Sequence, residues 1–362
     1  MHFIIYISVG FIAMQLINVL LNALFRQKIQ CSQQQNSELI SVLIPARNEE
    51  ANIDELLRSL QQTKNDKLEI IVFDDNSSDN TAHIVQQFCE TDNRVQLIRS
   101  VHLPKDWLGK NHACYQLAQH ARGNYFLFID SDIKVNGNIA ADAVSYLQKH
   151  RLGLVSVFPT QIQKTIGEKI SVPIMNYILL TLLPLIFVRV SPFASHAAAN
   201  GQFMLFDAEI YRKLQPHRLV KESPVEDIAI SRLLKKQKIK IACLAGEKRI
   251  ECRMYHSYSD ALNGFSKNIF MFFGNVPLLA FLFWVCACFG IVPVILFEKS
   301  AVLIYLAVMA LIQVLYSVTS KQNVIYNILF FPVQLLFMLH VMLKAIITHK
   351  NKNYTWKGRN IY

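Results

Sequence analysis

The chain has 362 residues, of which 52% are hydrophobic and 17% are charged, and its formal net charge is +11. This composition is too apolar for an ordinary soluble protein, and the length leaves room for one large domain together with membrane segments. The positive charge suits an anionic membrane surface or a nucleotide diphosphate. We expect no nucleic-acid partner, because the basic residues are dispersed and form no recognisable nucleic-acid module. The seven cysteines lack metal-type spacing, which indicates reduced thiols facing the cytosol.

The first apolar segment, residues 3–25, is long enough to span a bilayer. It has no basic head and no small-residue cleavage site, so we expect a retained anchor over residues 1–26 rather than a cleaved signal peptide. Arg26 and Lys28 follow this segment, and no Lys or Arg precedes it. The positive-inside rule therefore predicts an external N-terminus and a cytoplasmic location for the residues that follow.

Strand and helix patterns alternate through a domain that we expect over residues 39–256. Strands are expected at 39–44, 68–73, 94–98, 125–129, 152–158, 200–206 and 239–244. Helices are expected at 50–62, 79–88, 110–121, 139–148 and 224–237. This alternation predicts an α/β fold with a mostly parallel, right-handed wound sheet.

Further apolar segments interrupt and follow this domain. Residues 171–190 contain Pro173 and Pro184, and we expect them to be interfacial or re-entrant, because a full crossing would separate acidic residues that we expect in one site. A buried soluble helix is the alternative. The pattern of residues 257–274 predicts an amphipathic helix at the membrane surface.

The C-terminal region, residues 276–347, contains three apolar runs typical of membrane helices, at 276–297, 301–318 and 324–347. Together with the N-terminal anchor, three crossings would put the basic and aromatic tail, 348–362, outside the cell. That placement conflicts with the positive-inside rule, so the number of crossings stays open.

The strongest indication of chemistry is Asp130-Ser131-Asp132, which directly follows the apolar strand pattern at 125–129. Open α/β sheets bind ligands beyond the carboxyl ends of their strands. Two carboxylates one residue apart can share Mg²⁺ or Mn²⁺, which also accepts substrate phosphates as ligands. An ordinary polar turn in which an Asp caps the next helix is the alternative. We expect a metal–diphosphate here, with Asp130 and Asp132 as metal ligands.

Other candidate residues also follow strands or begin helices. A base and ribose could be held by the turn after the first strand, which comprises Pro45, Ala46, Arg47, Asn48 and Glu49. Asp74 and Asp75, after the second strand, could accept the imide N–H of uracil. Lys110, in the first turn of a helix, could neutralise a diphosphate. Gly201 could let a ligand approach the backbone closely. Each residue also has a structural explanation as a turn, a helix cap or a solvated lysine.

Two further groups could complete a site. Glu226 and Asp227 lie in the first turn of an expected helix, where its dipole stabilises carboxylates. If they face the metal, one of them can act as a general base on an acceptor hydroxyl; otherwise they only help the helix begin. Arg253 and Lys267 could close over the diphosphate from the membrane side, although Lys267 also fits the positive face of a surface helix.

Taken in order, these stretches resemble a membrane-bound family 2 glycosyltransferase of the GT-A fold. The matching segments are PARNEE (45–50), FDDNSSDNT (73–81), WLGKNHA (107–113), FIDSD (128–132), NGQF (200–203) and VED (225–227). A narrower resemblance is to the diaponeurosporenoate (carotenoid-acid) glycosyltransferase group, and hopanoid-pathway transferases are similar. It is carried by WLGKNHACYQ (107–116), RMY (253–255), GFSKN (264–268) and WKGR (356–359).

The resemblance implies that residues 45–49 and Asp75 hold uridine, that Asp130 and Asp132 hold the metal, and that Asp227 is the base. The Q-x-x-R-W signature of processive family members is missing, since the comparable segment reads GFSKN. We therefore expect inverting, metal-dependent transfer of one sugar from a UDP-sugar, with UDP-glucose as the expected donor. The expected acceptor is a carotenoid, a hopanoid or another membrane lipid.

Two alternatives remain at this stage. The chain could transfer a sugar to polyprenyl phosphate, or it could be a catalytically inactive membrane scaffold that keeps the fold. The presence of both triplet carboxylates, the Glu226–Asp227 pair and Lys110 favours an enzyme. We expect a multi-pass protein of the cell inner (cytoplasmic) membrane, with its catalytic domain in the cytoplasm. The sequence predicts no oligomeric state.

Overall fold

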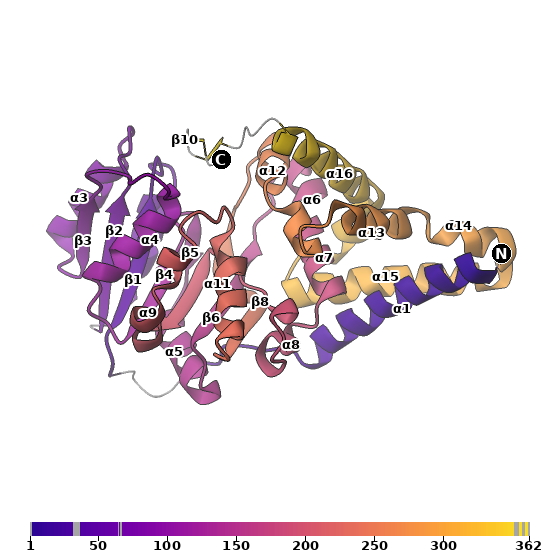
Figure 1. Ribbon diagram of the computed structural model, residues 1–362, viewed down its shortest axis with the longest axis horizontal. Helices are drawn as coiled ribbons and strands as arrows, with labels where there is room; N and C mark the ends of the chain where they lie inside the picture. Colours follow the sequence, from indigo (N-terminus) through magenta and orange to yellow (C-terminus); the bar gives the residue numbers. More distant parts are fainter. Residues whose placement is uncertain are drawn as a thin grey trace. The chain divides into compact units, whose positions relative to one another are not determined.

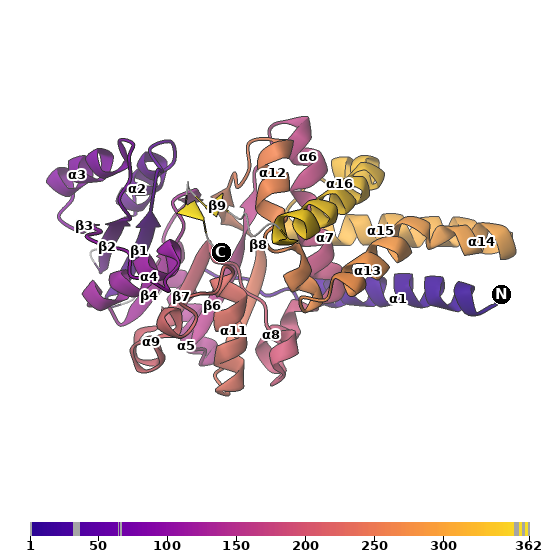
Figure 2. The same ribbon diagram turned by 45° about the horizontal axis from the view of Figure 1, so that its top comes forward.

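The computed structural model describes residues 2–31, 37–63, 65, 67–350, 355–356 and 359–360. The chain divides into two compact units. The first, here called the α/β unit, comprises Gln27–Thr160 and Leu185–Cys252, and the second, here called the helical unit, comprises Met1–Arg26, Gln161–Pro184 and Arg253–Tyr362. Figures 1 and 2 show the elements of each unit.

The α/β unit is built on an eight-stranded sheet with the strand order β3-β2-β1-β4-β7-β6-β8-β5. The strands are β1 (Ile40–Ala46), β2 (Leu68–Asp74), β3 (Val95–Arg99), β4 (Tyr125–Ile129), β5 (Ile133–Val135), β6 (Leu154–Gln161), β7 (Phe203–Asp207) and β8 (Ile241–Cys252). β3, β2, β1 and β4 pair in parallel, whereas β7 is antiparallel to both β4 and β6. β5 is antiparallel to β8. The predicted α/β class with a mostly parallel sheet is confirmed.

Helices cover both faces of the sheet. The helices of this unit are α2 (Ile53–Gln61), α3 (Thr81–Thr91), α4 (Gly109–His120), α5 (Ile139–His150), α8 (Leu185–Val190), α9 (Ala208–Leu214), α10 (Pro216–Leu219) and α11 (Glu226–Lys236), with a 3₁₀ turn, η1, at Ala194–His196. Apolar residues of α2, α3 and α5 form one core with alternate strand residues. α4 and α9 pack on the strands from the opposite side, where Phe126 contacts Tyr211.

Several features of this unit differ from the sequence prediction, among them the short strand β5, which was not predicted. The helices α9 and α10 were not predicted, because both are short and mostly polar. β8 has 12 residues and extends well beyond the predicted 239–244, since Glu247–Arg249 interrupts its apolar pattern with charges. β7 begins at Phe203, so residues 200–202 are a turn that precedes the strand.

The helical unit consists almost entirely of helices. They are α1 (His2–Leu24), α6 (Ile166–Ser171), α7 (Pro173–Leu182), α12 (Tyr258–Phe265), α13 (Pro277–Phe289), α14 (Ile291–Phe297), α15 (Val302–Ser320) and α16 (Val324–Lys350), with 3₁₀ turns η2 (Ile269–Phe273) and η3 (Lys299–Ala301). Two short strands, β9 (Thr355–Trp356) and β10 (Arg359–Asn360), pair near the C-terminus. α1 and α15 run side by side in both views (Figures 1 and 2).

Among the described residues, three helices are long and apolar enough to cross a membrane: Phe3–Leu24, Lys299–Ser320 and Val324–Thr348. The predicted continuous helix at 276–297 is instead broken into α13 and α14, which are bent by 43° and would make a fourth crossing only if they form one span. The predicted surface helix is also broken, into α12 and η2. Most of the tail, 348–362, lies outside the described residues, including Lys357 and Gly358.

The apolar segment 172–190 is divided at Leu183 and Pro184, so that α7 belongs to the helical unit and α8 to the α/β unit. α7 is tied to α1 by polar side chains of α1. Asn22 Nδ2 lies 2.9 Å from Leu180 O and 3.0 Å from Leu183 O. The interfacial or re-entrant placement of this segment stays a prediction.

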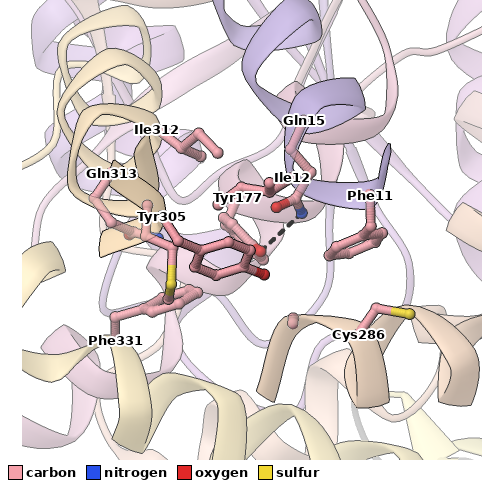
Figure 3. Close-up of a pocket in the computed structure, with 11 residues that line it drawn as sticks. Phe11, Ile12, Gln15, Tyr177, Cys286, Tyr305, Ile312, Gln313 and Phe331 are labelled. Carbon is pink, nitrogen blue, oxygen red and sulfur yellow. Dashed lines mark hydrogen bonds between the residues drawn. The ribbon is translucent and has the colours of Figure 1, made fainter. Parts of the chain in front are cut away.

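A small pocket lies inside the helical unit among α1, α7, α13, α15 and α16 (Figure 3). Gln15 Nε2 donates there to the hydroxyl of Tyr177 at 2.8 Å. Gln313 Oε1 is buried and has no hydrogen-bond partner among the described residues. The buried Gln15–Tyr177 bond contributes to the packing of α7 on α1.

Candidate active site

A lysine joins two acidic segments at the carboxyl end of β4. β4 ends at Ile129, so Asp130 is the first residue beyond the buried strand. Lys110 Nζ lies 2.9 Å from Asp130 Oδ1 and 2.9 Å from Glu226 Oε1. Its side chain is only 22% exposed, which strengthens both ion pairs relative to surface pairs. Three segments that are distant in the sequence therefore meet at the ammonium group of Lys110.

The loop before α11 is held against the first turn of α4. Asn111 Nδ2 donates to the carbonyl oxygens of Val220, Lys221 and Ser223 at 2.9–3.1 Å. The backbone N–H of Leu108 donates to the Lys221 carbonyl at 3.0 Å. These bonds explain why Lys110 and Glu226 are adjacent. Asn111 was not identified from the sequence, because its neighbour Lys110 was the more obvious candidate for chemistry.

The charged groups shift one another's protonation. Burial raises the pKa of Asp130 to about 7, against the opposing effect of Lys110. Burial and the neighbouring charge of Glu226 raise the pKa of Asp227 to about 7. The pKa of Glu226 is lowered, because its attraction to Lys110 outweighs its burial. Glu226 is thus the ionised partner of Lys110, whereas Asp227 can exchange a proton near neutral pH.

The carboxylate of Asp227 is held by backbone donors on both oxygens. The amide of Gly201 lies 2.9 Å from Oδ2, and the amide of Ile228 lies 2.7 Å from Oδ1. A Cβ atom at residue 201 would lie 3.0 Å from Glu226 Oε1 and 3.1 Å from Lys110 Nζ. A larger residue here would displace these side-chain ends by a few tenths of an ångström, so glycine allows the charged groups to approach the backbone closely.

Asp132 is the second carboxylate of the triplet, and it contacts the residue after Gly201. Gln202 Nε2 lies 3.1 Å from Asp132 Oδ2 and 3.3 Å from Oδ1. The same nitrogen lies 2.9 Å from the sulfur of Cys252. Gln202 was not singled out from the sequence, although it stands within the NGQF segment that carries part of the family resemblance.

The expected nucleotide-binding loops after β1 and β2 are bonded to each other. Arg47 Nη1 donates to the carbonyl oxygens of Asp75 and Asn76. Asn48, with a φ of 52°, accepts from the Ser78 amide through its side chain at 2.9 Å. Arg47 and Asn48 therefore hold the neighbouring loop in place, which leaves any contact with a nucleotide as a prediction.

The other expected nucleotide-site residues lie at the same edge of the sheet. Pro45 and Ala46 are the last residues of β1, and the Ala46 carbonyl accepts from the Asp75 amide at 2.8 Å. The Glu49 amide donates to Thr81 Oγ1 at 2.7 Å. Asp74 and Asp75 are buried, at 5% and 2% exposure. Asp74 Oδ1 accepts from the Ser77 amide, so Asp74 stabilises the turn.

Arg253 and Lys267 belong to the helical unit. Arg253 Nη2 lies 2.7 Å from Glu168 Oε1, and Glu168 is fully buried. Thr165 caps the beginning of α6, where its Oγ1 accepts the backbone N–H of Glu168. Arg253 thus has a structural partner within its own unit. A role for Arg253 or Lys267 in binding a diphosphate stays a prediction.

The donor set of the triplet suits a hard divalent cation. Asp130 and Asp132 supply carboxylate oxygens, and Gln202 Oε1 is a buried oxygen without a hydrogen-bond partner among the described residues. No group of three or more His, Cys, Asp or Glu side chains that could hold a metal occurs in the described part of the chain. Mg²⁺ and Mn²⁺ commonly take one or two carboxylates and complete their shell with water and substrate phosphates, so two carboxylates fit.

The chain is similar to known proteins both in sequence and in fold. Residues 41–214 match the model of the family Glycosyl transferase family 2. A 4,4'-diaponeurosporenoate glycosyltransferase of Staphylococcus haemolyticus (strain JCSC1435) is 25% identical to the chain, over 90% of this chain and 89% of that protein. One of the same name from Staphylococcus aureus (strain MRSA252) is 29% identical, over 65% of this chain and 61% of that protein.

Among solved structures, the mannosyltransferase PcManGT from Pyrobaculum calidifontis, in complex with GDP-Man and Mn²⁺, has a TM-score of 0.60 to this chain. The two are 16% identical, and the alignment covers 95% of this chain and 99% of that one, which shows a shared fold. The predicted resemblance and enzyme class are confirmed: the chain is a glycosyltransferase that carries a family 2 domain of the GT-A fold over residues 41–214.

Proposed function

We propose that this protein transfers a single sugar, with inversion, from a UDP-sugar to a lipid-like acceptor in the membrane. The observation that carries the proposal is the meeting of Lys110, Asp130 and Glu226 at the end of β4, with Asp227 beside them. In such a group, the positive charge of Lys110 can stabilise a departing diphosphate, and the carboxylate of Asp227 can take a proton from the acceptor. The carotenoid-acid glycosyltransferases among the relatives support a lipid-like acceptor.

The donor base would lie beside the loops that follow β1 and β2. In this proposal the carboxylate of Asp75 accepts an N–H of the base, while residues 45–49 surround the ribose. The ring N–H of uracil fits this role, and cytosine has no equivalent donor. Guanine does have one, and the neighbour of known structure holds GDP-Man, so the donor must be tested with both nucleotides.

The diphosphate would lie over the first turn of α4. Asp130 and Asp132 are the residues that would hold Mg²⁺ or Mn²⁺, and the bound cation would neutralise charge on the departing diphosphate. Lys110 adds a positive charge at a helix N-terminus whose amides also favour anions. Removing one well-placed electrostatic donor from an active site typically costs about 10²–10³ in rate, which is the size of effect expected for Lys110.

Asp227 is the proposed general base. Its carboxylate, with a pKa of about 7, takes the proton of the acceptor hydroxyl while the acceptor oxygen bonds to the anomeric carbon of the sugar. The bond from that carbon to the diphosphate breaks at the same time, and UDP leaves with its electron pair. A carboxylic-acid acceptor is already ionised at neutral pH and needs little help from the base.

We further propose that the protein is a multi-pass protein of the cytoplasmic membrane, with the α/β unit in the cytoplasm. In the part of the chain that the structure describes, three helices are long and apolar enough to cross a bilayer. Arg26 and Lys28 directly follow α1, which favours a cytoplasmic location for the residues after it. A lipid acceptor would then be available in the same membrane as the enzyme.

The test is mass spectrometry of lipid extracts from cells with and without the gene, together with a donor assay on the purified full chain. We expect a glycolipid that is present only with the gene, and its mass identifies the sugar and the acceptor. A phosphate in the product would indicate a polyprenyl phosphate acceptor. Identical extracts, with no consumption of UDP-glucose or GDP-mannose in Mn²⁺, would contradict the proposal.

A further inference from the structure

We propose that Gln202 is a positioning residue that orients Asp132 for a divalent cation. Through its turn it also links the proposed metal ligands, Asp130 and Asp132, to the proposed base, Asp227. This inference rests on the proposed function, because it concerns the same site. It is carried by the contacts of the turn Asn200-Gly201-Gln202, which precedes β7. This turn bonds to Asp130, Asp132 and Asp227.

The contacts of Gln202 involve both carboxylate residues of the triplet. Its backbone carbonyl accepts the N–H of Asp130 at 3.2 Å. Its side-chain nitrogen donates to Asp132, 3.1 Å from Oδ2 and 3.3 Å from Oδ1. Gln202 is 5% exposed, so these bonds are shielded from water. One residue thereby fixes the backbone of the first carboxylate and the side chain of the second.

The orientation of the Gln202 amide follows from its neighbours. If the amide were turned over, its oxygen would face the two oxygens of Asp132, and two hydrogen bonds of the nitrogen would be replaced by contacts between acceptors. With the nitrogen facing Asp132, the oxygen is buried without a hydrogen-bond partner among the described residues. A buried amide oxygen beside a carboxylate is a hard donor atom of the kind that divalent cations and their bound waters use.

The turn itself is held firmly to the sheet. Ser156 Oγ accepts the N–H of Asn200 at 2.7 Å and donates to the Asn200 carbonyl at 3.0 Å. Asn200 Oδ1 accepts the N–H of Gln202 at 2.8 Å. The intervening Gly201 donates to Asp227 at 2.9 Å. A displacement of Gln202 would therefore be transmitted to Asp227 through the adjacent Gly201.

The test measures cation binding directly, without turnover. The variant Gln202→Met keeps an unbranched side chain of similar length and removes the amide. Mn²⁺ affinity is measured on the full chain by electron paramagnetic resonance, and UDP affinity is measured with and without Mn²⁺. Gln148→Met is the matched control, since Gln148 donates to Glu38 and to the hydroxyl of Tyr125 in the same unit, at the other end of β4.

We expect the Mn²⁺ dissociation constant of Gln202→Met to rise about 10- to 100-fold, as is typical when a residue that orients a metal ligand is removed. UDP binding in Mn²⁺ should weaken, while UDP binding without the cation and the values for Gln148→Met stay unchanged. Gln202→Asn, which keeps the amide but is one methylene shorter, should also bind Mn²⁺ more weakly, and it replaces the Met variant if that one fails to fold.

A Mn²⁺ dissociation constant within about twofold of the wild type, in a folded Gln202→Met or Gln202→Asn variant, would overturn this inference and leave the proposed function intact. If the wild-type protein itself binds neither Mn²⁺ nor UDP, the proposed function fails and the inference fails with it. The wild-type titration therefore distinguishes the two failures.

Discussion

Replacing Lys110 by methionine should destabilise the α/β unit, and the loss should depend on pH. Lys110 Nζ lies 2.9 Å from an oxygen of each of Asp130 and Glu226. At that distance and an effective dielectric constant of about 20, each attraction is about 6 kcal/mol before desolvation is counted. Breaking a buried ion pair costs roughly 3–5 kcal/mol, and partial exposure of Lys110 favours the lower figure. We therefore expect a loss of about 3 kcal/mol at pH 8.

The sign of the pH dependence follows from the carboxylates left behind. The pKa values of Asp130 and Asp227 are raised to about 7 in the folded protein, so the folded state binds their protons more tightly than the unfolded chain does. Between about pH 4 and 7 these groups therefore favour folding less as the pH rises. Removing Lys110 raises both pKa values further, so the deficit of the variant should grow with rising pH and shrink near pH 5.5.

The assay is thermal unfolding of the full chain at pH 5.5 and pH 8, with UDP affinity measured on the same samples. For a unit of this size, about 3 kcal/mol corresponds to roughly 6–12 °C in melting temperature. Lys221→Met serves as the control, because the ion pair that Lys221 makes with Glu222 is long, at 3.7 Å, and exposed. Equal melting temperatures for Lys110→Met and the wild type at pH 8, with unchanged UDP affinity, would refute the reasoning.

Three further predictions concern the proposed base and the glycine beside it. Asp227→Asn should reduce transfer to an alcohol acceptor at least 100-fold, the size of a general-base contribution, without weakening UDP binding; an equal loss of UDP affinity would contradict its role as a base. For the wild type, transfer to an alcohol should decline below about pH 7 as Asp227 takes up a proton, whereas transfer to a carboxylic acid should persist to lower pH; parallel profiles would argue against Asp227. Gly201→Ala should weaken UDP binding roughly tenfold, because the new Cβ at 3.0–3.1 Å pushes Lys110 and Glu226 apart, and unchanged titration curves would exclude this effect.

Much of the α/β unit could be predicted from the sequence, because its strands are short runs of apolar residues with polar turns at their ends. β4 is the best example, since all five of its residues are buried and its bounds agree with the prediction. The direction of β7 was not predictable in this way. It has the same apolar pattern as a parallel strand, and only its pairing with β4 and β6 shows that it runs the other way.

In the helical unit, the long apolar helices were predictable from the sequence, but the points at which helices break were not. Apolar composition identifies α1, α15 and α16, but it also predicts one helix through residue 290. A Cβ atom at residue 290 would clash with the Cys286 carbonyl oxygen and the Tyr305 hydroxyl, and α13 and α14 diverge at this glycine. Such a bend depends on neighbouring helices, which a hydropathy pattern does not describe.

The candidate site shows the same division between local and tertiary information. Asp130 and Lys110 were identifiable because each stands at a position where a strand ends or a helix begins. Gln202 and Asn111 were not identifiable, because their importance lies in hydrogen bonds to residues far away in the sequence. The partner of Gln202 is 70 positions away, and that of Asn111 is 109 positions away. Residues whose role is to hold another side chain carry no local signal of it.

The central claim is that acidic groups from distant segments form one site for a nucleotide diphosphate sugar. Calorimetric titration of UDP into the full-length protein, with and without Mn²⁺ and in Asp132→Ala, tests this claim most directly. We predict saturable binding that tightens with Mn²⁺ in the wild type and loses this Mn²⁺ dependence in the variant. Mn²⁺-independent binding that is identical in both proteins, or no binding in either, would contradict it.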